Sequence, residues 1–97
     1  MSKLALERIA ENKRTKAVTL NLGNCNIAKL PTSLRDCIWL KELWVSENLK
    51  LDDLSPLSGL SNLQLLYCYS TQVSDLSPLV GLSNLQQLSC YLTQVSD

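Results

Sequence analysis

The sequence predicts an α/β solenoid with one parallel sheet on its concave side and a helical cap at its N-terminal end. Three observations predict it. Residues 54–75 and 76–97 are two copies of a 22-residue unit, identical at 18 of 22 positions. Apolar residues in these copies alternate with mostly polar ones, the period of a strand that buries one face. Residues 1–16 lie outside the repeat. A fixed period of this length is typical of solenoids, since each unit buries its apolar edge by stacking on its neighbour.

Residues 1–16 are expected to form the helical cap, with a helix over about residues 3–13. Ser2 can cap its start, and the apolar side is supplied by Leu4, Leu6, Ile9 and Ala10. A terminal unit of a solenoid needs a polar outer face, which the charged residues of this segment provide. The alternative, a membrane-binding amphipathic helix, is disfavoured because the segment is short and its charges are mixed. The sequence has no apolar run long enough to span a membrane, and charges occupy the place of a signal peptide's apolar region.

Residues 17–97 are expected to form about four repeats, the last one incomplete, with one strand in each. The step from Leu20 to Leu43 to Leu66 is 23 residues, and the step from there to Leu88 is 22. The inward strand pairs recur at this spacing: Leu20/Leu22, Leu43/Val45, Leu66/Cys68 and Leu88/Cys90. Strands that recur once per repeat of a solenoid are expected to form a parallel sheet.

The segments between the strands predict short return paths. In the third repeat, apolar residues at three-residue spacing indicate a 3₁₀-like or extended segment. Ser55-Pro56 and Ser77-Pro78 suit the start of such segments, and Gly59 and Gly81 are expected to allow the bend back into the next strand. The corner after each strand carries a short side chain, expected to hydrogen-bond the backbone of the next coil: Cys25, Asn48, Thr71 and Thr93.

This spacing resembles the leucine-rich-repeat family over about residues 17–97. The two copies with their D-L-S-P-L-x-G-L sequence are similar to the bacterial repeats of 22 or 23 residues, and Leu30-Pro31-x-x-Leu34 resembles a longer repeat type. Residues 11–25, followed by Leu30-Pro31, also resemble the start of the repeats in Roco-type proteins, where the repeats precede a GTPase domain. The sequence has no G-x-x-x-x-G-K-[ST] loop, so GTP binding is carried over to no residue.

The concave face of the sheet is the predicted partner-binding surface. The outward positions of the strands carry four of the five aromatic residues of the chain, and aromatic residues with a polar group are frequent anchors of protein interfaces. Three of the four differences between the two copies lie on or beside this face. The alternative is that cross-strand aromatic contacts only stabilise an exposed sheet. The predicted contact residues are Glu42, Trp44, Leu65, Tyr67, Tyr69 and Tyr91.

The resemblance and this face together imply a protein- or peptide-binding module. The alternative is an architectural or self-associating repeat arm of a larger, Roco-like GTPase. The last repeat stops before its return segment, so we expect a fragment of a longer array or an uncapped end that pairs with another molecule.

Charge and composition argue against other function classes. The net charge is zero, with +4 in residues 1–50 and −4 in residues 51–97, and the repeats carry no basic stripe for a nucleic acid. With no histidine, Ser-His-Asp and Cys-His arrangements are excluded, and no C-x-x-C pair suggests zinc. Asp52 and Asp53 are adjacent carboxylates at a corner, where they are expected to diverge. We therefore expect no enzyme, no cofactor and no metal site.

The four cysteines fall at core or corner positions of the repeat: Cys25, Cys37, Cys68 and Cys90. Free cysteine at such positions behaves as a small apolar residue. The sequence thus predicts structural thiols in a reducing compartment and a cytoplasmic protein.

Overall fold

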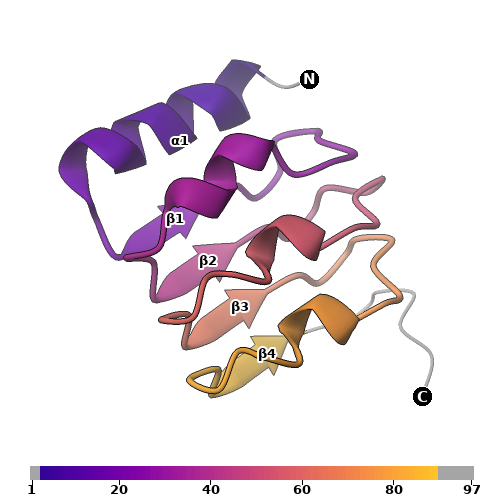
Figure 1. Ribbon diagram of the computed structural model, residues 1–97. Coiled ribbons are helices and arrows are strands. Elements are labelled where there is room, and N and C mark those ends of the chain that lie inside the picture. The colour runs from indigo at the N-terminus through magenta and orange to yellow at the C-terminus, as the bar shows by residue number, and fades with distance from the viewer. Residues whose placement is uncertain (1–2, 90–97) are drawn as a thin grey trace.

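The computed structural model describes residues 3–89, and within them the chain forms a single stack of successive coils beside one α-helix (Figure 1). The elements follow in the order α1 (Lys3–Thr15), β1 (Thr19–Asn21), η1 (Thr32–Asp36), β2 (Glu42–Trp44), η2 (Ser55–Leu57), β3 (Leu65–Tyr67), η3 (Ser77–Leu79) and β4 (Gln87–Ser89), where η denotes a 3₁₀-helix. The predictions that concern Cys90, Tyr91 and Thr93 lie outside the described residues.

The four strands form a parallel sheet in the order β1-β2-β3-β4. Leu20, Leu43, Leu66 and Leu88 are in register across it, as the repeat spacing predicts. Figure 1 shows each strand on one side of its coil and the 3₁₀ segment on the other. The predicted α/β solenoid with a parallel sheet is therefore confirmed. The described residues contain no helix of the length and apolar character that a membrane crossing needs.

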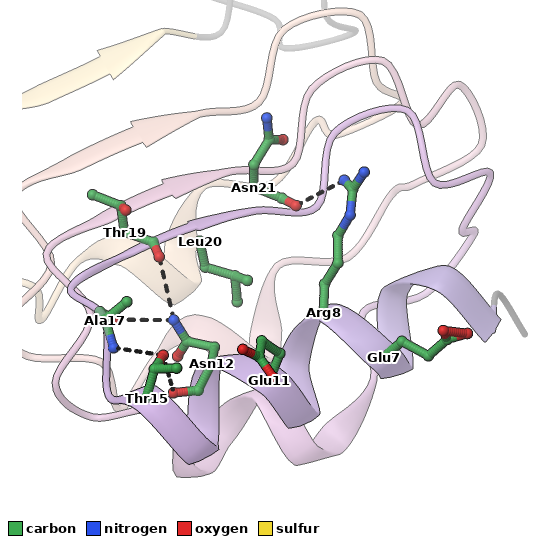
Figure 2. Close-up of a pocket in the computed structure, with 9 residues that line it drawn as sticks. All are labelled: Glu7, Arg8, Glu11, Asn12, Thr15, Ala17, Thr19, Leu20 and Asn21. Carbon is green, nitrogen blue, oxygen red and sulfur yellow. Dashed lines mark hydrogen bonds between the residues drawn. The ribbon is translucent and has the colours of Figure 1, made fainter.

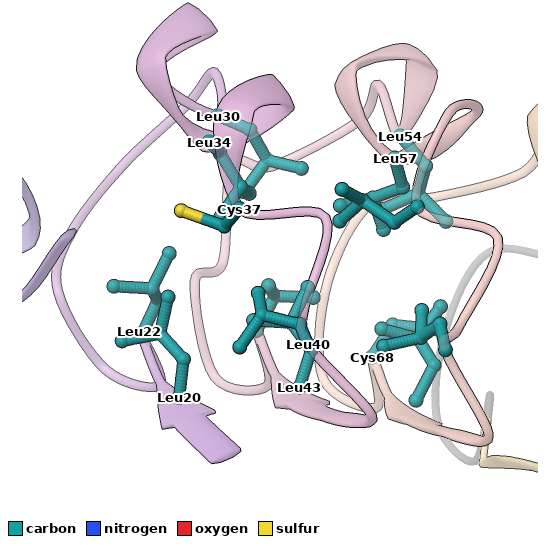
Figure 3. Close-up of a cluster of buried hydrophobic side chains, with 14 of the residues drawn as sticks. Leu20, Leu22, Leu30, Leu34, Cys37, Leu40, Leu43, Leu54, Leu57 and Cys68 are labelled. Carbon is teal, nitrogen blue, oxygen red and sulfur yellow. The ribbon is translucent and has the colours of Figure 1, made fainter. Parts of the chain in front are cut away.

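Leucine side chains fill the space between the sheet and the 3₁₀ segments (Figure 3). Leu43 and Leu66 enter this core from the strands, and Leu34 and Leu57 enter from the opposite side; all four are completely buried. Burying a leucine stabilises a fold by about 1.5–3 kcal/mol before chain entropy is counted. The core therefore explains why the leucine spacing is kept so closely from repeat to repeat.

The helix α1 covers the edge of β1. Only some of the residues predicted to form its apolar side are buried. Ile9 is buried as predicted, whereas Leu4 and Leu6 are 45% and 41% exposed. The polar Asn12 is buried instead: its Nδ2 donates to the carbonyl oxygens of Ala17 at 2.9 Å and Thr19 at 3.2 Å. Its Oδ1 accepts a hydrogen bond from the indole of Trp39 at 2.8 Å. An unpaired strand edge exposes backbone acceptors, and α1 satisfies one of them with an amide.

The buried corner residue Asn48 ties its coil to the preceding coil, whereas the prediction was the next coil. Its Nδ2 donates to the carbonyl oxygens of Leu22 at 2.9 Å and Val45 at 2.8 Å. Its Oδ1 accepts from the backbone N–H groups of Cys25 at 2.9 Å and Ile27 at 3.3 Å. The prediction was wrong about direction because the spacing of residues does not show which neighbour a corner side chain faces.

The bonds of Thr71 among the described residues, at the equivalent corner, lie within its own coil. Its Oγ1 donates to the carbonyl oxygen of Cys68 at 2.7 Å and accepts from the N–H of Val73 at 3.3 Å. The threonine side chain is one atom shorter than asparagine, and these two bonds engage it locally. The corner of the next coil, where the predicted partner of Thr71 would be, lies outside the described residues, so the link stays a prediction.

The predicted role of glycine in the bends is also wrong. A Cβ atom added at Gly59 or Gly81 would meet nothing within 4 Å, and neither glycine has a positive φ. Three of the five left-handed residues in the described part of the chain lie at equivalent positions after the strands instead: Asn24 (φ 52°), Glu47 (φ 62°) and Ser70 (φ 56°). The chain thus turns sharply where the strand ends, and 3₁₀ turns shape the return path.

Aspartates, rather than the predicted serines, cap the 3₁₀ segments. The residue at the N-cap position of η2 is Leu54, and the backbone N–H of Ser55 donates to Asp53 Oδ1 at 2.8 Å. In the next coil, the N–H of Ser77 donates to Asp75 Oδ1 at 2.9 Å. Because the ionised carboxylate accepts the backbone bond better, this contact lowers the pKa of both aspartates.

Candidate functional site

Three aromatic side chains form a continuous cluster on the concave face of the sheet. The rings of Trp44 and Tyr67, which are in register on β2 and β3, have centroids 5.3 Å apart and planes tilted by 30°. The ring of Tyr69 lies 6.4 Å from Tyr67 and meets it edge-on at 74°. All three side chains are half-buried, so each combines a fixed position with an accessible surface.

Glu42 and Leu65 extend this face toward the start of the strands. They are register partners on β2 and β3, two residues before Trp44 and Tyr67, and strand alternation directs all four to the same side. Both are half-buried. The structure thus brings five of the six predicted contact residues onto one face, and the sixth, Tyr91, lies outside the described residues. We call these five residues the aromatic face.

A small pocket of about 220 Å³ borders the aromatic face where the chain leaves β1 and β2. Ser46, two residues after Trp44, is only 3% exposed, and its Oγ has no hydrogen-bond partner in the described structure. A Cβ atom on Gly23 would come within 2.9 Å of Asn21 Oδ1, so the absence of a side chain there keeps this corner compact. The residues that line the pocket are Arg8, Asn21, Gly23, Asn24, Trp44, Ser46, Glu47 and Tyr69.

Arg8 and Ser46 line this pocket and were not predicted from the sequence. Arg8 comes from α1, and its Nη1 donates to the carbonyl oxygen of Asn21 at 2.9 Å and to Cys25 Sγ at 3.7 Å. No repeat position relates a residue of the cap to a strand, so the sequence carries no signal for this contact. Ser46 occupies the repeat position that Tyr69 occupies in the next repeat, so the repeat pattern gave no reason to expect a buried hydroxyl there.

A more open groove of about 470 Å³ lies between α1 and the outer edge of β1 (Figure 2). Its polar groups are mostly engaged in holding the cap in place. Asn12 binds Ala17 and Thr19, and Thr15 Oγ1 accepts a hydrogen bond from the N–H of Ala17 at 3.3 Å. Glu11 pairs with Arg14, whose guanidinium lowers the pKa of this carboxyl group. The groove is thus a seam between cap and sheet rather than a set of convergent reactive groups.

The described thiols are buried. Cys25 is 4% exposed, and Cys37 and Cys68 are completely buried. Burial raises the pKa of the Cys37 thiol, so this side chain stays protonated and weakly nucleophilic. These three positions match the predicted structural thiols.

The adjacent aspartates diverge, as predicted. Asp52 Oδ1 lies 2.9 Å from the ammonium group of Lys29, while Asp53 caps η2. Residues 3–89 hold no cluster of three or more potential cysteine, aspartate or glutamate ligands for a metal ion.

Comparisons with known proteins place the architecture in a family. The family model described as leucine-rich repeats (2 copies) matches residues 18–59. Among solved structures, internalin C2 from Listeria monocytogenes is 41% identical with a TM-score of 0.64, over 68% of this chain and 29% of that one. The internalin inlF from the same organism is 28% identical with a TM-score of 0.53, over 68% of this chain and 26% of that one. A search of the curated proteins found no match.

The parallel sheet, the leucine core and these matches define a leucine-rich-repeat solenoid. The chain is a leucine-rich-repeat protein. It corresponds to less than a third of the length of the two internalins. The resemblance to Roco-type proteins stays a prediction.

Proposed function

We propose that this chain is a protein- or peptide-binding module that contacts its partner through the aromatic face, extended by Tyr91. The observation that carries the proposal is the half-buried cluster of Trp44, Tyr67 and Tyr69, whose rings contact one another on the sheet face opposite the core. The fold and the internalin neighbours suggest a protein-interaction repeat module.

The chemistry of the aromatic face supports a peptide partner. Tyrosine and tryptophan offer a large, rigid contact area together with a polar group, and few rotatable bonds are fixed when they bind. Mutual ring contacts hold Tyr67 between Trp44 and Tyr69, so little further order is needed on binding. Glu42 adds a negative charge beside the apolar Leu65, which gives the face a means of orienting a partner.

The alternative function, an architectural or self-associating arm of a larger protein, makes no use of the aromatic face. The two functions therefore differ in what happens when that face is changed while the core is left intact. This difference defines the experiment.

In the test, peptides that bind the 97-residue chain are selected from a random peptide library. Their affinity is then measured for the unchanged chain and for its variants. Trp44→Ala and Tyr67→Ser are expected to weaken binding by about tenfold or more, the effect of losing one interface anchor. Val80→Ser is the matched control, since Val80 is 85% exposed beside η3, on the other side of the coil from the sheet. Peptides that bind all three variants as tightly as the unchanged chain would contradict the proposal.

A further inference from the structure

The pocket beside the aromatic face contains a positive charge without an ionic partner. The ion pairs among residues 3–89 are Lys13–Asp36, Arg14–Glu11 and Lys29–Asp52, and none of them involves Arg8. Arg8 is half-buried, and its described bonds all use one nitrogen, Nη1. A guanidinium has five N–H donors in a planar fork, so most of its donor capacity is available.

The second feature is the unsatisfied hydroxyl of Ser46. A buried polar group without a hydrogen-bond partner is unfavourable in a folded protein and is therefore uncommon. In the described part of the chain, Ser46 Oγ is the buried side-chain atom that lacks one, and Ser46 lines the same pocket as Arg8. An unpaired charge and an unpaired hydroxyl in one pocket indicate a ligand that would satisfy both.

We propose that this pocket binds a carboxylate group of a peptide partner, with Arg8 supplying the charge and Ser46 Oγ a hydrogen bond. The amide side chains of Asn21 and Asn24 line the same pocket and add further donors. Glu47 is the acidic residue of the lining, but its side chain is exposed, so water and salt screen it more than the half-buried Arg8. A cationic ligand would be repelled by Arg8, which makes a carboxylate the fitting ligand.

The inference rests on the proposed function in one respect, because it assigns the pocket to the same partner as the aromatic face. Its test does not, because free tripeptides can occupy this pocket of about 220 Å³, which Trp44 and Tyr69 line, without reaching Glu42, Leu65 or Tyr67. Failure of the tripeptides would remove the carboxylate site and leave the aromatic face to its own test.

The experiment titrates the isotope-labelled 97-residue chain with four blocked tripeptides and follows its amide, indole and guanidinium signals by NMR. The first is acetyl-Ala-Glu-Ala-amide, and the neutral control is the glutamine analogue. The third, acetyl-Ala-Gln-Ala with a free C-terminus, separates a terminal carboxylate from a side-chain carboxylate. The fourth carries arginine in place of glutamate.

The expected result is binding of at least one carboxylate peptide with shifts at Gly23, Ser46 and the Arg8 guanidinium, several-fold tighter than the glutamine analogue. Arg8→Gln is expected to weaken it about tenfold, and Arg8→Lys to weaken it less, because lysine keeps the charge but loses the fork. Ser46→Ala is expected to weaken binding without lowering the stability of the free chain. Glu47→Gln is expected to strengthen binding about twofold, because it removes a repulsive charge.

If Arg8→Gln disturbs the packing of α1, its loss of binding is not informative. Glu47→Gln still tests the carboxylate site, because this substitution leaves α1 unchanged. Tighter binding of the arginine peptide, or weaker carboxylate binding in Glu47→Gln, would overturn the proposal. Absence of shifts with both carboxylate peptides at millimolar concentration would overturn it as well.

Discussion

Two nearly identical stretches of this chain, residues 54–75 and the described part of residues 76–97, bury the same leucines to different extents. Leu63 and Leu66 in the first copy are completely buried. Their counterparts in the second copy are Leu85, which is half-buried, and Leu88, which is 39% exposed. The difference cannot come from the residues themselves. The first copy contacts a coil on each side, whereas within residues 3–89 β4 pairs only with β3.

The N-terminal side of the sheet shows what a covering element changes. Leu20, on β1, is also in the outermost strand of the described sheet, yet it is only 7% exposed. The helix α1 covers that edge and places Ile9 and Ala5 in the core. In a solenoid, the contribution of a residue to stability is therefore set by the coils or the helix that pack on either side of it.

Alanine at matched leucine positions gives the largest expected difference between the copies. Leu66→Ala leaves a cavity between two coils and is expected to lower the free energy of unfolding by about 2–5 kcal/mol. Leu88→Ala removes a side chain that is 39% exposed and is expected to cost less than half as much. Urea unfolding monitored by circular dichroism measures both. Equal losses would mean that the outer side of β4 is covered as fully as that of β3.

The corner residues offer a second matched pair with a smaller expected effect. Asn48→Ala removes bonds to three buried backbone groups of the preceding coil and to the Val45 carbonyl of its own coil, and is expected to cost about 1–3 kcal/mol. Thr71→Ala removes bonds within one coil only and is expected to cost less. Hydrogen exchange separates the mechanisms, because only the asparagine variant should expose the Cys25 amide of the neighbouring coil. Unchanged protection at Cys25 would show that Asn48 does not link the coils.

The outward aromatic positions should have the least effect on folding. The first copy has Tyr67 where the second has Ser89, so Tyr67→Ser copies one repeat into the other. Its ring contacts with Trp44 and Tyr69 lie on the sheet surface, and their loss is expected to cost about 0.5–1.5 kcal/mol. Thermal unfolding of Tyr67→Ser and of Leu66→Ala compares the two losses of stability at residues that are adjacent in sequence. A larger loss for Tyr67→Ser would mean that the inward and outward sides of β3 are reversed.

The sheet and its register could be predicted because they depend only on the strand alternation and on the spacing of the repeats. Alternation sends Leu66 inward and Tyr67 outward, and the spacing of the repeats sets which strand residues become neighbours. The grouping of Trp44, Tyr67 and Tyr69 follows from the same two quantities. Neither depends on the detailed conformation of a loop.

The features that could not be predicted depend on the position of one side chain relative to a different coil or element. The capping bond of Asp53 requires a turn that the Ser-Pro sequence does not specify, and Asn48 could have faced either neighbour. The approach of Arg8 to Asn21 depends on how α1 packs on β1. The burial of Ser46 depends on the left-handed turn at Glu47, the next residue.

Asp53 and Asp75, which directly precede the two copies and cap their 3₁₀ segments, should respond to pH equally, unlike the leucines, because each bond joins residues only two apart in the chain. The backbone bonds from Ser55 and Ser77 lower the pKa of Asp53 and Asp75 below the ordinary value of 3.8. Each cap therefore stabilises the fold fully above that value, and its contribution is lost as the pH falls through the lower pKa of the folded state. Asp53→Asn and Asp75→Asn keep an oxygen acceptor but cannot titrate. We expect each to reduce the acid-induced fall in melting temperature below pH 3.8 by a similar small amount, with the double variant reducing it by the sum. A response confined to Asp53 would show that these caps, like the leucines, depend on a coil on each side.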